Sequence, residues 1–89
     1  MAFYVYIIQS QVEGSFYKGF SENPVQRLAQ HNDGSATYTS RKIPWKLVYV
    51  EEFPSKQEAL IREKNLKNAT IERINALINH PKNIVARLE

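Results

Sequence analysis

Two apolar segments near the start of the chain predict a β-hairpin. Residues 3–9 ("FYVYIIQ") are aromatic and β-branched without polar alternation, which is typical of a central strand covered on at least one face. A shorter strand is expected at residues 16–20 ("FYKGF"), and the turn-forming letters "SQVEGS" lie between the two. A turn centred on residues 11–12 would place Tyr6 opposite Tyr17, unless the glycine of this turn carries a bulge that shifts the register.

A third strand is predicted at residues 45–53 ("WKLVYVEEF"). Because side chains alternate along a strand, Val48 and Val50 should face one side of the sheet. The opposite side should carry Trp45, Leu47 and Tyr49.

The letters "SENP" predict the start of a helix, with Asn23 as the N-cap and Pro24 as the first helical residue. Arg27 and His31 are four residues apart, so they should project from one shared face. The expected buried stripe of this helix consists of Val25, Leu28 and Ala29.

A second helix should begin at Ser55, because Ser55 and Glu58 form a capping box. Its inward stripe is predicted to be Ala59, Leu60 and Leu66, with Glu63 among them. A third helix is expected over residues 70–79, before "HP", with Ile71, Ile74, Leu77 and Ile78 inward.

Glu63 would place a carboxylate on a packing face. Burial of an ion without a partner costs several kcal/mol, so Glu63 should meet an arginine, a lysine or a metal ion there. A salt bridge to Lys67, or a position at the edge of the core, would explain it equally well.

Length and composition limit the class of protein. The chain has 89 residues, no cysteine and no apolar run near the roughly 20 residues of a membrane span. We therefore expect one domain over residues 1–89 in the cytoplasm, with no membrane and no disulfide.

The formal net charge is only +3, but residues 34–46 ("GSATYTSRKIPWK") are locally basic and aromatic. Such a segment suits a polyanion, although a solvated basic loop has the same composition. Its candidate nucleic-acid-binding residues are Tyr38, Arg41, Lys42 and Lys46.

Several polar residues together suggest phosphodiester hydrolysis, which needs a water nucleophile, a cation and a proton acceptor. Glu63 is a candidate ligand for one hard divalent ion. Arg27 is a candidate donor of two hydrogen bonds to a phosphate oxygen. Tyr17 is the candidate base, with His31 as an alternative base or a hydrogen-bond partner of the phosphate. Taken singly, each of these residues also has an ordinary packing or surface explanation.

These residues and their order resemble the GIY-YIG nuclease family. "YVY" at residues 4–6 stands at the first triplet and "YKG" at residues 17–19 at the second. The pattern continues with Arg27, "HNDG", "PWKLVYVEEF" and "EALIREKNLK", the last of which contains Glu63. The match therefore covers residues 3–68 and leaves a C-terminal helix and tail at 70–89. The likeness is to small stand-alone bacterial members, which are similar to the N-terminal nuclease domain of the bacterial excinuclease.

The resemblance implies an α/β (α+β) sandwich with a three-stranded antiparallel sheet flanked by helices. It also implies DNA hydrolysis with one Mg²⁺ or Mn²⁺ ion and no nucleotide cofactor. By position, Tyr17 would be the tyrosine that acts as the base or orients the water. Tyr6 would be its hydrogen-bonding companion, and Gly19 would be the close-approach glycine. Arg27 would stabilise the phosphate, Glu63 would bind the metal, and His31 matches a position that is histidine or tyrosine in active relatives.

The chain departs from the family pattern at three positions. Tyr4 replaces a glycine, Lys18 replaces an isoleucine and should point away from Tyr17, and Phe20 stands where several active relatives carry a lysine. With no attached recognition module expected, DNA binding should be weak and salt-sensitive, and a protein partner would supply targeting. The sequence therefore supports a DNA endonuclease acting in repair or recombination on branched or damaged DNA. The alternative is a nucleic-acid or protein binding module that keeps the fold without cleavage.

Overall fold

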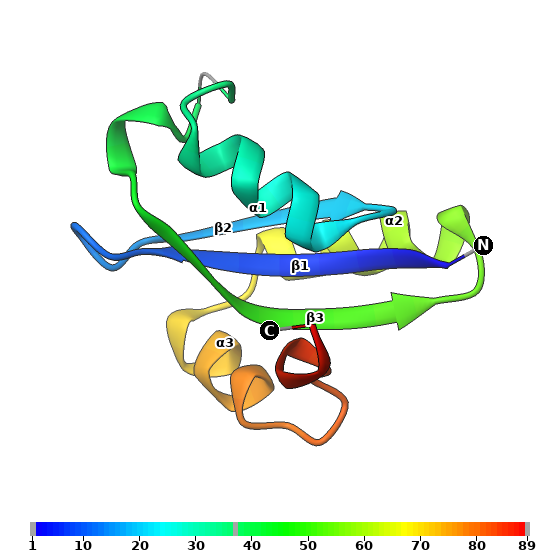
Figure 1. Ribbon diagram of the computed structural model, residues 1–89. Coiled ribbons are helices and arrows are strands. Elements are labelled where there is room, and N and C mark those ends of the chain that lie inside the picture. Colours follow the sequence, from blue (N-terminus) through cyan, green and yellow to red (C-terminus); the bar gives the residue numbers. More distant parts are fainter. Residues whose placement is uncertain (1, 37, 89) are drawn as a thin grey trace.

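The computed structural model describes residues 2–36 and 38–88. Its centre is a three-stranded antiparallel sheet in the order β2-β1-β3, formed by β1 (Phe3–Ser10), β2 (Phe16–Ser21) and β3 (Trp45–Phe53) (Figure 1). The predicted three strands, the antiparallel sheet and the flanking helices are confirmed.

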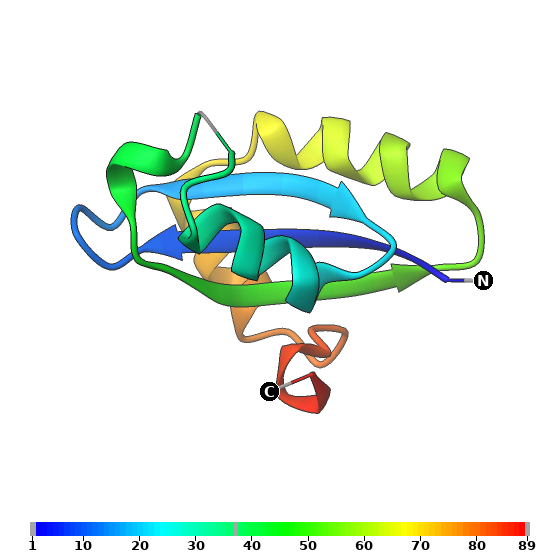
Figure 2. The ribbon, with the colours of Figure 1, turned by 45° about the horizontal axis from the view of Figure 1, so that its top comes forward.

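Helices cover both faces of the sheet (Figure 2). One face carries α1 (Pro24–Asn32), and the other carries α2 (Lys56–Lys67) and α3 (Ile71–Ile78). The core on the α1 face contains Tyr6, Ile8, Trp45, Leu47 and Val50, whereas the core on the α2 face contains Val5, Ile7, Tyr49, Ala59, Leu66 and Ile74. Alternate residues of β1 enter the two cores, which explains why this strand is apolar along its length.

The hairpin register differs from the predicted one. Tyr6 lies opposite Gly19, and Tyr17 lies opposite Ile8. The turn is longer than expected because Ser10 N–H bonds the carbonyl of Ser15 at 2.9 Å. The shift is two residues, so Tyr6 and Tyr17 still share a face of the sheet.

A register shift opposite residues 7–8 of β1 changes the faces of β3. Ile7 pairs with Tyr49 and Ile8 pairs with Leu47, so Val48 is an extra residue between the two pairs. Tyr49 therefore enters the α2-side core, while Leu47 remains on the α1 side. The prediction that Trp45, Leu47 and Tyr49 share one face is wrong for Tyr49.

All three helices begin with a side-chain N-cap, and for α1 and α2 the cap is the predicted residue. Asn23 Oδ1 accepts from Gln26 N–H at 3.1 Å, and Ser55 Oγ accepts from Glu58 N–H at 3.2 Å. Thr70 caps α3 in the same way. These bonds satisfy backbone N–H groups that the first helical turn leaves open.

The inward faces of the helices are narrower than predicted. In α1, Val25 is 47% exposed and Ala29 is exposed, whereas His31 is fully buried. The side chain of Asn32 bonds the backbone N–H and carbonyl of Trp45, and this contact fixes the rotation of α1 against β3. Two more residues expected inside are exposed, Leu60 by 40% and Ile71 by 66%.

The segment after α3 is fastened to β3. Asn83 accepts from Val50 N–H at 3.0 Å and donates to the carbonyls of Val48 and Ile78, each at 2.9 Å. The following 3-10 helix, Val85–Arg87, packs against the α1-side core.

A buried hydrogen-bonded chain links β1, α1 and the loop after α1. Tyr6 Oη lies 2.9 Å from His31 Nε2, and His31 Nδ1 lies 2.8 Å from Thr39 Oγ1. Thr39 donates its one hydroxyl hydrogen to the carbonyl of Ala36, so it accepts from Nδ1, and Nε2 accepts from Tyr6. Burial, and then the neighbouring Arg27, hold the pKa of His31 below its usual 6.5, which favours this neutral form.

We predict that Gly19→Ala destabilises the fold. A Cβ at position 19 would lie 2.5 Å from both Cζ and Oη of Tyr6. Overpacking of this kind costs about 1–3 kcal/mol, which urea denaturation would measure. The cost should be smaller in a Tyr6→Leu background, where the ring is absent; an equal cost in both backgrounds would show that the ring contact is not responsible.

We predict that acid destabilises the protein through His31. The pKa of His31 is lowered in the fold, so the unfolded chain binds more protons just below pH 6.5, and stability falls as the pH drops from that value. The slope of unfolding free energy against pH should flatten in His31→Gln and persist in His80→Gln, which removes an exposed histidine. Equal slopes in the natural protein and His31→Gln would contradict this prediction.

Candidate active site

The candidate site lies along β2, an edge strand of the sheet. Gly19 on β2 has no side chain, and the Tyr6 ring from the neighbouring β1 fills the space where a Cβ would be. The Tyr6 hydroxyl is thereby carried over β2 toward its free edge. This contact gives a physical reason for the glycine that the sequence placed beside the site.

Tyr6 has a strongly shifted pKa. Burial, with a smaller contribution from Tyr17, raises the pKa of Tyr6 to about 12, while Arg27 acts in the opposite direction. Glu63 also raises this pKa. Tyr17, Arg27 and Glu63, from β2, α1 and α2, thus all act on the pKa of Tyr6, and Glu63 has the smallest effect.

Tyr17 is half-buried among aromatic rings. Its ring meets the His31 ring edge-on at a centroid distance of 5.1 Å and lies 5.8 Å from the Tyr38 ring. These contacts hold the ring from the side of α1 and the following loop. Within the described part of the chain, its hydroxyl forms no hydrogen bond, and it is therefore available to a substrate or to water.

Arg27 and His31 share the face of α1 that is turned to the sheet, as their spacing predicts. One nitrogen of Arg27, Nη1, donates to Gln30 Oε1 at 2.9 Å. The planar guanidinium has further donors for a second partner such as a phosphate oxygen. His31 is fully buried and acts through its bond to Tyr6 rather than at the surface.

Glu63 is half-buried on α2, on the other side of the sheet edge from α1. The ion pairs within residues 2–36 and 38–88 are Lys42–Glu13 and Arg62–Glu51, so Glu63 has no salt bridge to Lys67. No cluster of three or more His, Asp or Glu side chains lies within the same residues. A single carboxylate suits Mg²⁺ or Mn²⁺ that keeps most of its water or binds substrate oxygens, and it does not suit a fully protein-bound ion.

A hollow of about 390 Å³ lies beside Tyr17. It is lined by Phe16, Tyr17, Lys18, Tyr38 and Lys67. Lys18 and Lys67 bring two positive charges to the site, and neither was among the residues selected from the sequence. The strand alternation that turns Lys18 away from Tyr17 holds, but at a free edge both faces of the strand reach the same hollow.

The basic residues that are close in the sequence do not form one patch. Tyr38 is 76% exposed beside Tyr17, and Arg41 is exposed on the next turn of the chain. Lys42 is ion-paired with Glu13 at 2.9 Å near the hairpin turn. Lys46 lines a different hollow beside β3, together with residues of the C-terminal segment.

The chain is similar in sequence to small bacterial proteins. A UPF0213 protein of Streptococcus pneumoniae is 42% identical over 65 residues, which are 72% of this chain and 65% of that protein. A UPF0213 protein of Staphylococcus haemolyticus is 45% identical over 65 residues, 72% of this chain and 78% of that protein. The chain thus matches just under two thirds of the length of the pneumococcal relative.

A solved structure is similar over almost the whole chain. The solution NMR structure of a UPF0213 protein from Bacillus halodurans has a TM-score of 0.59 and 30% sequence identity, covering 99% of this chain and 94% of that one. The family model for the GIY-YIG catalytic domain matches residues 2–75, which contain Tyr6, Tyr17, Gly19, Arg27 and Glu63. The family resemblance seen in the sequence is confirmed, and the chain belongs to the GIY-YIG family.

Proposed function

We propose that this protein is a metal-dependent DNA endonuclease that hydrolyses phosphodiester bonds. One observation carries the proposal: Tyr17, Arg27 and Glu63, from three different elements, all act on the pKa of Tyr6 on the central strand. Membership of the GIY-YIG family supports it, since nuclease domains of this family act on DNA.

The proposed roles follow from the state of each side chain. Arg27 binds a nonbridging phosphate oxygen and offsets the charge that develops in the transition state. Tyr6 keeps its proton at neutral pH, because its pKa is about 12, and donates it to His31. Its oxygen is then an acceptor that orients the attacking water. Tyr17, once its own hydroxyl proton has passed to solvent, is left as the group that takes the water's proton.

Glu63 is the residue proposed to hold one Mg²⁺ or Mn²⁺ ion. Such an ion, when bound, supplies a Lewis acid for phosphate oxygens and lowers the pKa of water. Glu63 and Arg27 approach the edge of β2 from helices on opposite faces of the sheet. A phosphate on this edge would therefore have the positive charge of Arg27 on one side. On the other side would be the negative charge of Glu63, which would hold the divalent cation.

The hollow beside Tyr17 gives the DNA strand a place to continue. Lys18 and Lys67 are proposed to bind the neighbouring phosphate, and the exposed Tyr38 ring to contact the sugar or base. Few such contacts on a domain of net charge +3 give weak, salt-sensitive binding.

The proposed setting is the cytoplasm, where the protein would act in repair or recombination on branched or damaged DNA. None of the helices in residues 2–36 and 38–88 has the length and apolar character to cross a membrane.

One observation favours the alternative of a binding module without catalysis. Phe20, at a position where several active relatives carry a lysine, stacks on Phe3 at a centroid distance of 6.0 Å and packs against the α2-side core. This position therefore adds no positive charge to the site. The two functions differ in their dependence on Glu63, because binding alone does not need a metal ligand.

We predict that Glu63→Gln abolishes cleavage while leaving the fold and DNA binding intact. Loss of several kcal/mol of charge stabilisation should lower the rate on labelled duplex, single-stranded and branched DNA roughly a hundredfold or more with Mg²⁺ or Mn²⁺. Glu52→Gln removes an exposed carboxylate from β3 and is the matched control. NMR signals near residue 63 should shift with the ion in the natural protein and in Glu52→Gln, but not in Glu63→Gln. If the natural protein and both variants bind DNA equally and none cleaves it, the binding-module alternative is correct.

We predict that Tyr17→Phe lowers the single-turnover cleavage rate by about 10²–10⁴-fold, because it removes the group that accepts the proton. Tyr38→Phe removes a hydroxyl from the neighbouring ring and should change the rate little. DNA affinity, followed by fluorescence anisotropy, should be unchanged in both variants. Equal rates for Tyr17→Phe and the natural protein would exclude Tyr17 as the base.

A further inference from the structure

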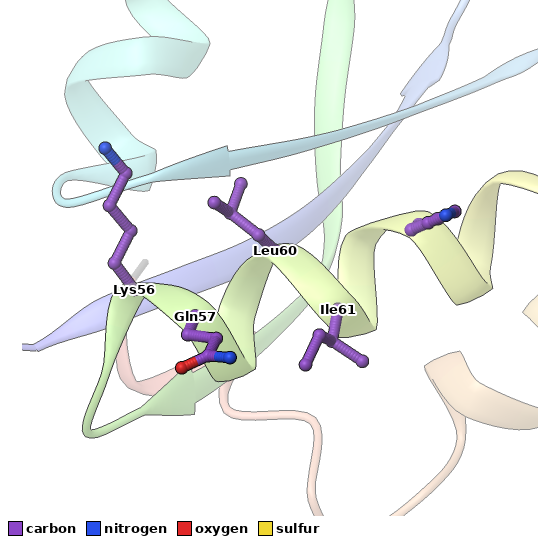
Figure 3. A pocket seen from close by; sticks show the side chains of 5 residues that line it. Lys56, Gln57, Leu60 and Ile61 are labelled. Carbon is purple, nitrogen blue, oxygen red and sulfur yellow. The ribbon is translucent and has the colours of Figure 1, made fainter.

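Helix α2 is apolar on two sides, and the sheet covers only one of them. Ala59 and Leu66 are fully buried against the sheet. On the outer side, Leu60 is 40% exposed and Ile61 is 54% exposed. Figure 3 shows both side chains projecting from the helix. A surface helix normally has a single apolar stripe turned to the core, so these two exposed side chains are apolar surface that the fold does not use.

Leu60 and Ile61 line a shallow hollow of about 520 Å³. Its lining residues are Lys56, Gln57, Leu60, Ile61 and Lys64, and Figure 3 shows the first four along α2. Lys56 and Lys64 are eight residues apart, which is about 12 Å along a helix, and Leu60 is midway between them. The groove is therefore apolar in the middle, with a positive charge toward each end and no acidic residue in its lining.

This charge pattern decides between possible occupants. A second copy of the chain, placed groove to groove, would bring lysines against lysines, which is unfavourable. DNA would satisfy the lysines but would set charged phosphates against Leu60 and Ile61. An amphipathic helix with acidic residues about two turns apart and a leucine or isoleucine between them would match both the charges and the apolar centre.

We propose that the outer groove of α2 binds an acidic amphipathic helix of a partner protein. Glu63 lies about 90° around α2 from the centre of the groove, at 100° per residue, so a docked helix need not cover Glu63. A partner bound to DNA would raise the local concentration of a domain that binds DNA weakly by itself. The docking itself does not depend on the proposed nuclease activity.

The test uses the whole protein and a synthetic acidic amphipathic peptide about five helical turns long, with glutamates two turns apart and a leucine midway between them. In ¹⁵N NMR titrations, we expect shifts along residues 56–64. Isothermal titration calorimetry would give the affinity. A double variant, Leu60→Gln with Ile61→Gln, should weaken binding about tenfold or more, because it removes the apolar contact. Ile71→Gln, which changes an exposed isoleucine on α3, is the matched control and should have no effect.

A charge swap makes the test specific. Lys56→Glu with Lys64→Glu should lose the acidic peptide and gain a peptide in which lysines replace the glutamates, while Lys82→Glu should change neither affinity. Absence of peptide binding, or equal binding of both peptides by the natural protein, would overturn the proposal. So would self-association or oligonucleotide binding that the Leu60→Gln, Ile61→Gln variant abolishes, because these outcomes assign the groove to a second copy or to DNA.

Discussion

The contact of the Tyr6 ring with the bare backbone of Gly19 determines where the polar groups of this protein meet. The Tyr6 ring is buried and belongs to the α1-side core. Here the missing side chain on β2 lets the ring pass over the edge strand, and His31 fixes its hydroxyl through a bond of 2.9 Å. Because Thr39 in turn fixes His31, the position of the hydroxyl depends on β1, β2, α1 and the loop after α1 together.

The position of β2 at the edge of the sheet explains why helices on opposite faces serve one site. Arg27 on α1 and Glu63 on α2 would be separated by the sheet if they faced its centre. Both nevertheless act on the pKa of Tyr6, whose ring lies against β2 at Gly19. The same geometry puts Lys18 and Tyr17, which point to opposite faces of β2, in the lining of one hollow. The site is therefore produced by the order of the strands as much as by the residues themselves.

The features that the sequence predicted correctly depend on local chemistry. The N-caps Asn23 and Ser55 and the third strand at 45–53 require only neighbouring residues, and each is found where expected. The incorrect details depend on long-range pairing: the hairpin register and the extra residue at Val48 change which residues face each other. The exposure of Val25 depends on how Asn32 holds α1 against β3.

The same distinction applies to the site. The residues of the family motif could be named from their order alone, but the approach of Lys18 and Lys67 to Tyr17 could not, because it requires knowing that β2 is at the edge. The sequence also could not show that the basic residues of the segment 34–46 lie apart from one another. The ion pair of Lys42 with Glu13 joins residues far apart in the chain.

The fastening of the C-terminal segment by Asn83 has a consequence for the behaviour of the protein at high concentration. The free edge of a sheet is a template on which a strand of another molecule can pair, and this is a common route to aggregation. Asn83 bonds Val50 N–H and the carbonyl of Val48, and Ile84 N–H bonds the carbonyl of Val50 at 3.0 Å. These bonds occupy backbone groups of β3 that a foreign strand would use. The segment after α3 thus protects the β3 edge of the sheet from intermolecular pairing.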